Sequence, residues 1–181
     1  MRDIARVVVV GVTGAGKSTF AQRLAARLDT AYVELDALFW DPGWTEAASE
    51  VFRARVERAV AGPGWVVDGN YGRVRDLLWP RADTIVWLDY GLPLVLGRLT
   101  ARTVRRAVTG EVLWNGNRER LREHCRVWSE RSLFHWLLKT YWAYRRELPV
   151  FLAQPAHAHL RVARLRRPHE ARAWLADIGR P

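Results

Sequence analysis

The residue types best suited to chemistry lie near the N-terminus, where residues 11–18 read Gly-Val-Thr-Gly-Ala-Gly-Lys-Ser. Four valines at residues 7–10 precede them, so the pattern predicts a buried strand, a glycine-rich turn and a helix beginning near Ser18. Glycine allows the positive φ angles that turn backbone amides around phosphate oxygens, and the helix N-terminus adds partial positive charge. Lys17 can reach the β- and γ-phosphates, and Ser18 can ligate Mg²⁺. The sequence therefore predicts a nucleoside-triphosphate site, with ATP and Mg²⁺ as the expected ligands.

Lysine is rare in this chain, which strengthens the interpretation of Lys17. Lys17 and Lys139 are the only lysines, and all other Lys or Arg positions are arginine. A compact ammonium on a flexible stem fits inside a phosphate-binding loop, whereas a planar guanidinium is bulkier. The loop residues expected to contact the nucleotide are Gly11, Thr13, Gly14, Ala15, Gly16, Lys17, Ser18 and Thr19.

Three aspartates follow predicted strands, namely Asp36, Asp68 and Asp89. Ligands of open parallel sheets bind beyond the carboxyl ends of the strands, close to the predicted phosphate loop. We expect Asp68 to hold Mg²⁺, directly or through water, and Asp36 to orient or deprotonate an acceptor, with turn capping as the alternative for both. For Asp89 we expect the capping role, because Tyr90-Gly91-Leu92-Pro93 is typical of a turn into a helix.

The absence of several known motifs indicates which reaction the predicted nucleotide site would serve. An Asn-Lys-x-Asp guanine motif cannot occur around Lys17 or Lys139, and the Leu-Ser-Gly-Gly-Gln signature of transporter ATPases is missing. Neither Asp68 nor Asp89 is followed by a glutamate that could activate water. Transfer to a second bound substrate is therefore favoured over direct hydrolysis, which indicates a kinase.

Arginines form a one-sided stripe on the helix predicted over residues 92–108. The stripe consists of Arg98, Arg102, Arg105 and Arg106. Spacings of four, seven and eight residues put them on one helix face, where like charges repel, so an anionic partner is indicated, with a merely solvated face as the alternative. The glycine-bearing segment 110–117 and Arg118 follow. We expect residues 103–125, approximately, to form a small arginine-rich lid.

Strand and helix patterns alternate along the chain, which predicts an α/β fold with helices on both faces of a parallel sheet, in three layers. Residues 1–181 are expected to form one domain. Strands are predicted at 4–10, 32–35, 65–68, 84–88 and 159–165. Helices are predicted at 17–28, from the N-cap Thr45 to about 61, at 92–108, at 118–147 before Pro149, and from Pro168.

The composition of the chain indicates where in the cell the protein is located and which kinds of partner it binds. No run of 18 apolar residues occurs, Cys125 is the only cysteine, and the N-terminus leaves no room for a signal peptide, so we expect a cytoplasmic location and no membrane partner. The net charge of +10 fits either nucleic acid or anionic small substrates. We interpret the aromatic run between Trp128 and Tyr144 as core packing or a dimer face, with base stacking as the alternative. The oligomeric state stays open.

Together these features resemble the adenylate-kinase-like P-loop kinases, and more narrowly the bacterial proteins labelled DNA topology modulation protein. The resemblance covers nearly the whole chain and is carried by residues 11–18, 35–44, 67–71 and 114–119. It implies a P-loop NTPase fold with a five-stranded parallel sheet in the order 2-3-1-4-5.

Two stretches can be compared with adenylate kinases residue by residue. Asp68-Gly69 is similar to the start of their Asp-Gly-Phe-Pro-Arg motif, but Asn70-Tyr71-Gly72 replaces Phe-Pro-Arg, which puts AMP as acceptor in doubt. Arg98-Leu-Thr-Ala-Arg102 is similar to the Arg-Leu-x-x-Arg motif at the start of the lid, whose arginines contact ATP. The resemblance therefore implies ATP contacts for Arg98 and Arg102.

Two functions are compatible with these residues. The first is an ATP-dependent kinase that transfers the γ-phosphoryl group to a nucleotide or another small hydroxyl or phosphate acceptor. The second is an ATP-binding regulator of DNA topology or nucleic acid with weak or incidental ATPase activity. For the kinase, Ser18 and Asp68 are the expected metal ligands, and Arg118 joins Arg98 and Arg102 among the nucleotide contacts. Its expected catalytic residues are Lys17, Asp36, Asp68, Arg98 and Arg102.

Overall fold

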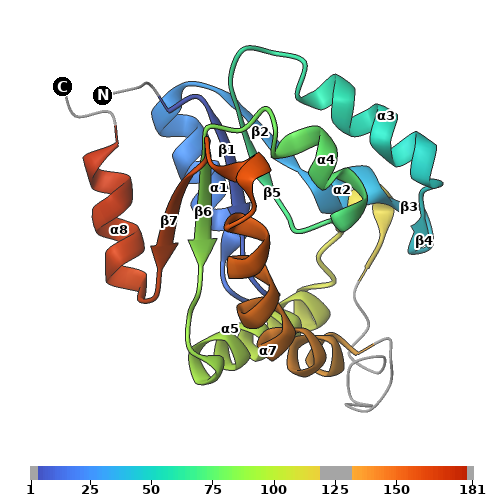
Figure 1. Ribbon diagram of the computed structural model, residues 1–181. Helices are drawn as coiled ribbons and strands as arrows, with labels where there is room; N and C mark the ends of the chain where they lie inside the picture. Colours follow the sequence, from blue (N-terminus) through green and yellow to red (C-terminus); the bar gives the residue numbers. More distant parts are fainter. Residues whose placement is uncertain (1–3, 119–131, 179–181) are drawn as a thin grey trace.

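The computed structural model describes residues 4–118 and 132–178, and its centre is a five-stranded parallel sheet (Figure 1). The strands lie in the order β2-β5-β1-β6-β7. Counted as the five strands expected from the sequence, this is the predicted order 2-3-1-4-5, because a separate short hairpin takes the labels β3 and β4. From one edge to the other the strands are β2 (Ala31–Glu34), β5 (Trp65–Asp68), β1 (Arg6–Val10), β6 (Thr84–Leu88) and β7 (Arg161–Leu165).

Helices cover both faces of the sheet, as Figure 1 shows. One core lies against α1 (Lys17–Leu28), α5 (Leu92–Thr109), the first half of α7 (Leu133–Leu152) and α8 (Pro168–Asp177). The other lies against α2 (Leu35–Phe39), α3 (Ser49–Ala59), α4 (Arg75–Leu78) and the end of α7. The predicted three-layer α/β architecture is confirmed.

The central strand β1 explains the run of four valines. Val7 and Val9 belong to one core and Val8 and Val10 to the other, so both faces of the strand are buried. Because β1 lies between β5 and β6, the carboxyl ends of these two strands flank the loop that follows it. This arrangement sets Asp68 and Asp89 on either side of the loop.

The N-terminal boundary predicted for α3 is wrong. Thr45 lies in β4 (Thr45–Glu46), which pairs antiparallel with β3 (Trp40–Asp41), and α3 begins at Ser49. The Ala47 amide donates a 2.8 Å hydrogen bond to the Phe39 carbonyl, which closes the chain into a hairpin. Pairing across the hairpin therefore outweighs the local N-cap preference of threonine.

The predicted end of α7 is also wrong. The helix continues through Pro149 to Leu152, and the Ala153 amide bonds the Pro149 carbonyl at 3.0 Å. Leu148, only 1% exposed, anchors this end in the second core, so packing outweighs the local effect of proline. The predicted helix over 118–147 is observed from Leu133; residues 119–131 of that prediction lie outside the described residues.

The aromatic run divides between core and surface. Tyr141 is buried, whereas Trp136 and Trp142 are 53% and 59% exposed, and Trp128 lies outside the described residues. Core packing therefore accounts for only part of the run. Within the described part of the chain, no helix has the length and apolar character needed to cross a membrane.

Candidate active site

The phosphate loop joins β1 to α1 through glycines with positive φ. These angles are +153° at Gly11, +81° at Gly14 and +89° at Gly16. A Cβ atom on Gly14 would lie 2.7 Å from the Val95 carbonyl oxygen of α5, so α5 leaves no space for a side chain. Gly16 is the N-cap of α1, and the amides of the first helical turn have no partners within that helix. This geometry fits an anion inside the loop.

Two side chains stabilise the loop. The Lys17 ammonium donates a 3.4 Å hydrogen bond to the Val12 carbonyl, which holds the side chain against the loop. Asn70, just beyond β5, binds Gly11 twice: its Oδ1 accepts from the Gly11 amide at 3.1 Å, and its Nδ2 donates to the Gly11 carbonyl. Asn70 thus ties the start of the loop to the end of the neighbouring strand.

Two arginines of α5 reach the same loop. Arg98 Nη1 donates to the Ala15 carbonyl at 3.1 Å, and Arg102 Nη2 donates to Thr13 Oγ1 at 3.4 Å. The Arg98 guanidinium also lies 5.2 Å from the centre of the Tyr90 ring. The structure therefore brings both arginines to the loop, while their contact with ATP stays a prediction.

A cavity of about 460 Å³ lies between the loop, α5 and α8. Its size is within the range of small-molecule sites. Residues 14–19 form one end, and Tyr90, Pro168 and Leu175 contribute to the wall. Gly11, Thr13 and Arg118, which we expected to contact the nucleotide, are not part of this wall. The arginines of the predicted stripe all line it, namely Arg98, Arg102, Arg105 and Arg106.

Asp68 lies at the end of β5, beside the phosphate loop, and is 4% exposed. Burial raises the pKa of its carboxyl group, and the nearby Lys17 ammonium and Ser18 hydroxyl oppose that rise. Tyr32 donates a 3.5 Å hydrogen bond to Oδ2, while Oδ1 is buried without a hydrogen-bond partner among the described residues. An oxygen donor of this kind next to a serine hydroxyl suits Mg²⁺, so the residues present fit the predicted metal site.

Asp36 lies in the short helix α2, beyond the end of β2. The Tyr71 hydroxyl donates a 2.5 Å hydrogen bond to Asp36 Oδ1, and the Tyr71 ring packs on Phe39 and Phe52. Burial raises the pKa of Tyr71, and the charge of Asp36 raises it further, so Tyr71 stays a hydrogen-bond donor at neutral pH. Tyr71 therefore fixes the orientation of the Asp36 carboxylate.

Glu34 adds a third carboxyl group to this end of the sheet. It pairs with Asp68 in the register of β2 and β5. Burial raises the pKa of Glu34, and the side chain of Trp114 opposes that rise as a hydrogen-bond donor. Glu34 thus connects the acidic strand ends with the segment that follows α5.

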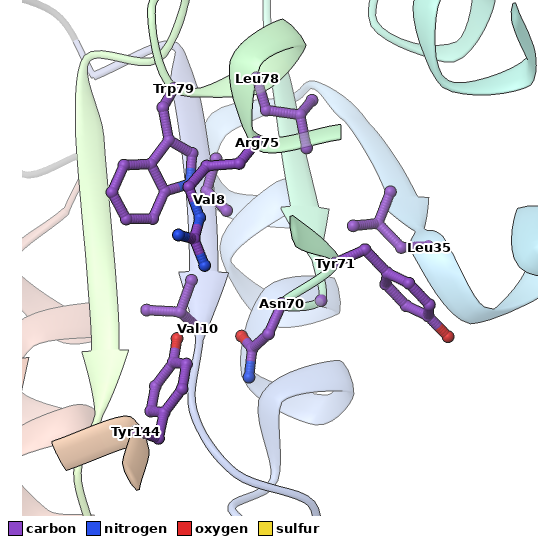
Figure 2. Close-up of a pocket in the computed structure, with 10 residues that line it drawn as sticks. Val8, Val10, Leu35, Asn70, Tyr71, Arg75, Leu78, Trp79 and Tyr144 are labelled. Atoms are coloured by element: carbon purple, nitrogen blue, oxygen red, sulfur yellow. The ribbon is translucent and has the colours of Figure 1, made fainter. Parts of the chain in front are cut away.

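A second, much smaller cavity of about 10 Å³ lies on the other side of β1. Figure 2 shows Arg75 from α4 and Tyr144 from α7 extending toward the space beside Val10, with Asn70 nearby. The Arg75 guanidinium lies 4.9 Å from the Trp79 ring centre and 4.5 Å from that of Phe151. The space suits about one water molecule and no larger ligand.

The capping role predicted for Asp89 is wrong. Its side chain is 3% exposed and forms ion pairs with Arg145 of α7 at 2.5 Å and with Arg164 of β7 at 2.7 Å. The N-cap of α5 is Gly91 instead. Asp89 holds three elements together because two guanidiniums that are distant in sequence converge on the end of β6.

Arg118 is not among the residues that line the cavity of about 460 Å³. It forms an antiparallel bridge with Val112, and its carbonyl accepts a 3.1 Å hydrogen bond from the Trp44 indole. The structure thus directs this end of the predicted lid toward the β3–β4 hairpin. Residues 119–125 of the predicted lid lie outside the described residues.

Several residues of the site were not identified from the sequence. Asn70 and Tyr71 appeared only as departures from a motif, although their position directly after Asp68-Gly69 was a usable signal. Glu34 and Tyr32 precede Asp36 on the predicted second strand, where alternation would have put them on the same side. The functions of these residues depend on contacts with other strands and helices.

Comparisons with known proteins identify the fold. No protein-family model matches the chain, and no curated protein matches it. A gluconokinase from Sinorhizobium meliloti 1021 is similar in structure, with a TM-score of 0.52 and 20% identity over 99% of this chain and 95% of the other.

Two shikimate kinases are similar to the same degree. The enzyme from Acinetobacter baumannii, solved with shikimate, has a TM-score of 0.52 and 16% identity over 97% of this chain and 90% of the other. The enzyme from Bacteroides thetaiotaomicron has a TM-score of 0.53 and 14% identity over 96% and 95%. The chain therefore shares its overall fold with these three kinases.

Proposed function

We propose that this protein is an ATP-dependent kinase that transfers the γ-phosphoryl group to a small acceptor. The observation that carries the proposal is the convergence of three features at one end of the sheet. These are a glycine-rich loop with Lys17, a buried carboxylate at Asp68 and an arginine-lined cavity of about 460 Å³. A phosphate-binding loop alone would serve any nucleotide-binding protein, whereas the acidic strand ends beside it supply a place for a second substrate.

The loop and its arginines would bind and neutralise the triphosphate. Lys17 would leave the Val12 carbonyl for the β- and γ-phosphates, and Arg98 and Arg102 would stabilise charge on the transferring group. Ser18 and Asp68 would hold Mg²⁺, which when bound neutralises charge developing between the β- and γ-phosphates. Tyr90 and Pro168 would contribute the apolar wall near the base.

Asp36 would act on the acceptor. Its carboxylate is held by Tyr71 and lies near enough to Asp68 to raise the pKa of that group. There it would orient an acceptor hydroxyl and accept its proton during transfer. A hydroxyl-bearing small molecule is favoured, and two neighbours in fold are named for such acceptors, shikimate and gluconate.

The test is a screen of acceptors with γ-labelled ATP and Mg²⁺. Candidate nucleosides, nucleotides, sugars and hydroxy acids are incubated with the protein, and labelled product is separated from inorganic phosphate. We expect one acceptor class to yield a phosphorylated product that depends on Mg²⁺ and is lost in Asp36→Asn. Release of inorganic phosphate alone, unaffected by every acceptor, would argue for an ATPase instead.

The alternative function is an ATP-binding regulator of DNA topology or nucleic acid. The observation that favours it is the net charge of +10, supplied almost entirely by arginine. Membership of the DNA topology modulation subgroup and a cytoplasmic location both stay predictions.

A further inference from the structure

Two segments far apart in the sequence are joined by side-chain amides. One is the hairpin β3–β4, residues 40–46, which follows the helix that carries Asp36. The other is residues 110–118, here named the neck, which follows the arginine-bearing helix α5. We infer that Asn115 and Asn117 clasp these segments into one unit and so couple nucleotide binding to the position of the acceptor-side hairpin. The inference rests on the proposed kinase function and names its positioning residues.

Asn117 forms the buried half of the clasp. It is 4% exposed, and its Oδ1 accepts a 2.9 Å hydrogen bond from the Trp44 amide. Its Nδ2 donates to the Asp41 carbonyl at 3.0 Å. One amide side chain thus satisfies a donor and an acceptor on opposite sides of the hairpin turn, which neither a carboxylate nor an aliphatic group can do.

Asn115 forms the exposed half. Its Nδ2 donates to the Trp40 carbonyl at 2.5 Å and to the Ala37 carbonyl at 3.3 Å. Ala37 is the residue next to Asp36, so this contact reaches the helix that carries the candidate base. The Trp44 indole adds a bond in the reverse direction, to the Arg118 carbonyl at 3.1 Å.

Backbone strain occurs on both sides of the clasp. Trp44 has φ of +57° and Asn115 has φ of +55°, the left-handed region that costs a residue with a side chain free energy. The hydrogen bonds of the clasp hold both residues in these conformations. Loosening the neck would therefore release the hairpin as well.

The neck is linked to the nucleotide cavity through two arginines that line it. Glu111 pairs with Arg105 at 3.2 Å and with Arg106 at 3.5 Å. The Arg106 guanidinium lies 5.9 Å from the Trp114 ring centre, and Trp114 in turn packs edge-on against Trp44. A triphosphate in the cavity would hold Arg105 and Arg106 in place at the start of the neck, so nucleotide binding would stabilise the neck and, through the clasp, the hairpin.

The experiment is amide hydrogen exchange with and without the Mg²⁺ complex of the β,γ-imido analogue of ATP. In the wild type we expect the analogue to slow exchange both in the phosphate loop and in residues 40–46. The test variant is Asn115→Gly, because glycine accepts the left-handed φ and removes only the clasp amide. In this variant the loop should respond as before, while the nucleotide-dependent slowing at 40–46 should fall by about threefold or more.

Glu46→Gln is the matched control. It removes the exposed 3.1 Å pair between Arg73 and Glu46 on the same hairpin but leaves both asparagines in place. The control should keep the nucleotide response of residues 40–46. Asn117→Ala provides a second test of the clasp, read in the same way, if Asn115→Gly fails to fold.

The outcomes separate this inference from the proposed function. Slowing in the loop without slowing at 40–46 in the wild type would overturn the coupling and leave nucleotide binding intact. An undiminished hairpin response in Asn115→Gly or Asn117→Ala would also overturn it. No slowing in either segment would contradict nucleotide binding, and the coupling with it.

Discussion

Asp68 is placed where its charge costs stability. Burial raises the pKa of this carboxyl group, so ionisation is harder in the folded protein than in the unfolded chain. The group therefore stabilises the folded state fully at pH values below its unfolded pKa. That contribution is lost as the pH rises through the higher folded pKa. A cation bound by the carboxylate would offset this cost.

Asp68→Asn should consequently separate stability from activity. Without ligands at neutral pH, the variant should melt at a higher temperature than the wild type, by about 2–4 °C for each kcal/mol recovered. Mg²⁺-dependent turnover should fall, because the amide lacks the charge that the cation requires. Thermal melting of both proteins at pH 5 and pH 8 tests this, since the gain in melting temperature of the variant over the wild type should be larger at pH 8. Normal turnover at low Mg²⁺ would show that Asp68 only caps a turn.

Lys17→Ala should remove triphosphate binding without unfolding the protein. The side chain makes one weak bond to a loop carbonyl, so the fold does not depend on it. In the wild type, saturating Mg–ATP at about 100 times Kd should add about 2.7 kcal/mol of stability. This corresponds to a rise in Tm of about 5–10 °C, which should shrink sharply in the variant. An equal rise in both proteins would count against the phosphate-loop interpretation.

At the scale of elements, helix α5 puts arginines that are regularly spaced in the sequence on one face, beside the phosphate loop. Arg98 and Arg102 are one helical turn apart, and both reach the phosphate loop. Gly14 permits this approach, since a larger residue there would meet the Val95 carbonyl. Helix and loop therefore form one continuous surface, which is the surface proposed to bind the triphosphate.

Arg102→Lys should lower kcat by about 10-fold or more, because lysine keeps the charge but loses the planar fork. Affinity for ATP should change less, since Lys17 and the loop amides remain. Steady-state kinetics measures both parameters, and Arg146→Lys, exposed on α7, is the matched control. Unchanged kcat together with weaker DNA binding would support the nucleic-acid function instead.

Asp89 acts at the junction of β6, β7 and α7. Asp89→Asn would leave two guanidiniums facing a neutral amide in a site that is 3% exposed. We expect the free energy of unfolding to fall by about 2–4 kcal/mol, less than for a fully buried pair because both arginines are partly exposed. Urea denaturation measures the loss. Asp76→Asn, which breaks an exposed pair with Arg53, should change stability little, and equal effects would refute the junction role.

At the scale of the whole molecule, charge is unevenly distributed. The net charge is +10, yet Glu34, Asp36 and Asp68 gather at the carboxyl ends of β2 and β5. In the proposed kinase, the positive field of the protein would attract the triphosphate, while the carboxylates would lie near the second substrate. Nucleic acid, by contrast, would use the exposed arginines.

Salt should distinguish these two uses of charge. For a kinase with a built site, phosphoryl transfer should change only a few-fold between 50 and 200 mM salt, because buried groups are weakly screened. Any DNA affinity that depends on 6–10 phosphate contacts should fall by about 10³–10⁵ over the same range. Turnover and DNA binding measured in parallel test this. A turnover that falls as steeply as DNA affinity would contradict the kinase proposal.

The sequence by itself determined those features of the protein that depend on residues close together in the chain. The order of the strands was implied only by the family resemblance. The loop at residues 11–18, the strands themselves and the arginine stripe of α5 follow from glycine spacing, apolar runs and helical periodicity. These patterns are local, and each is set by backbone geometry over one or two turns. Asp68 could also be selected as a candidate from the sequence, because it ends a predicted parallel strand. In an open parallel sheet, the ends of the strands beside a phosphate loop are where ligands bind.

Only the tertiary structure decided which distant groups meet. Asp89 lies 56 residues from Arg145 and 75 from Arg164, and Asn117 lies 73 from Trp44, so no local spacing encodes these contacts. The same holds for Asn70 on Gly11, for Tyr71 on Asp36 and for the position of Arg118 outside the cavity. Such pairs form because packing of the two cores brings strand ends and loops together. Their chemistry depends on the whole fold.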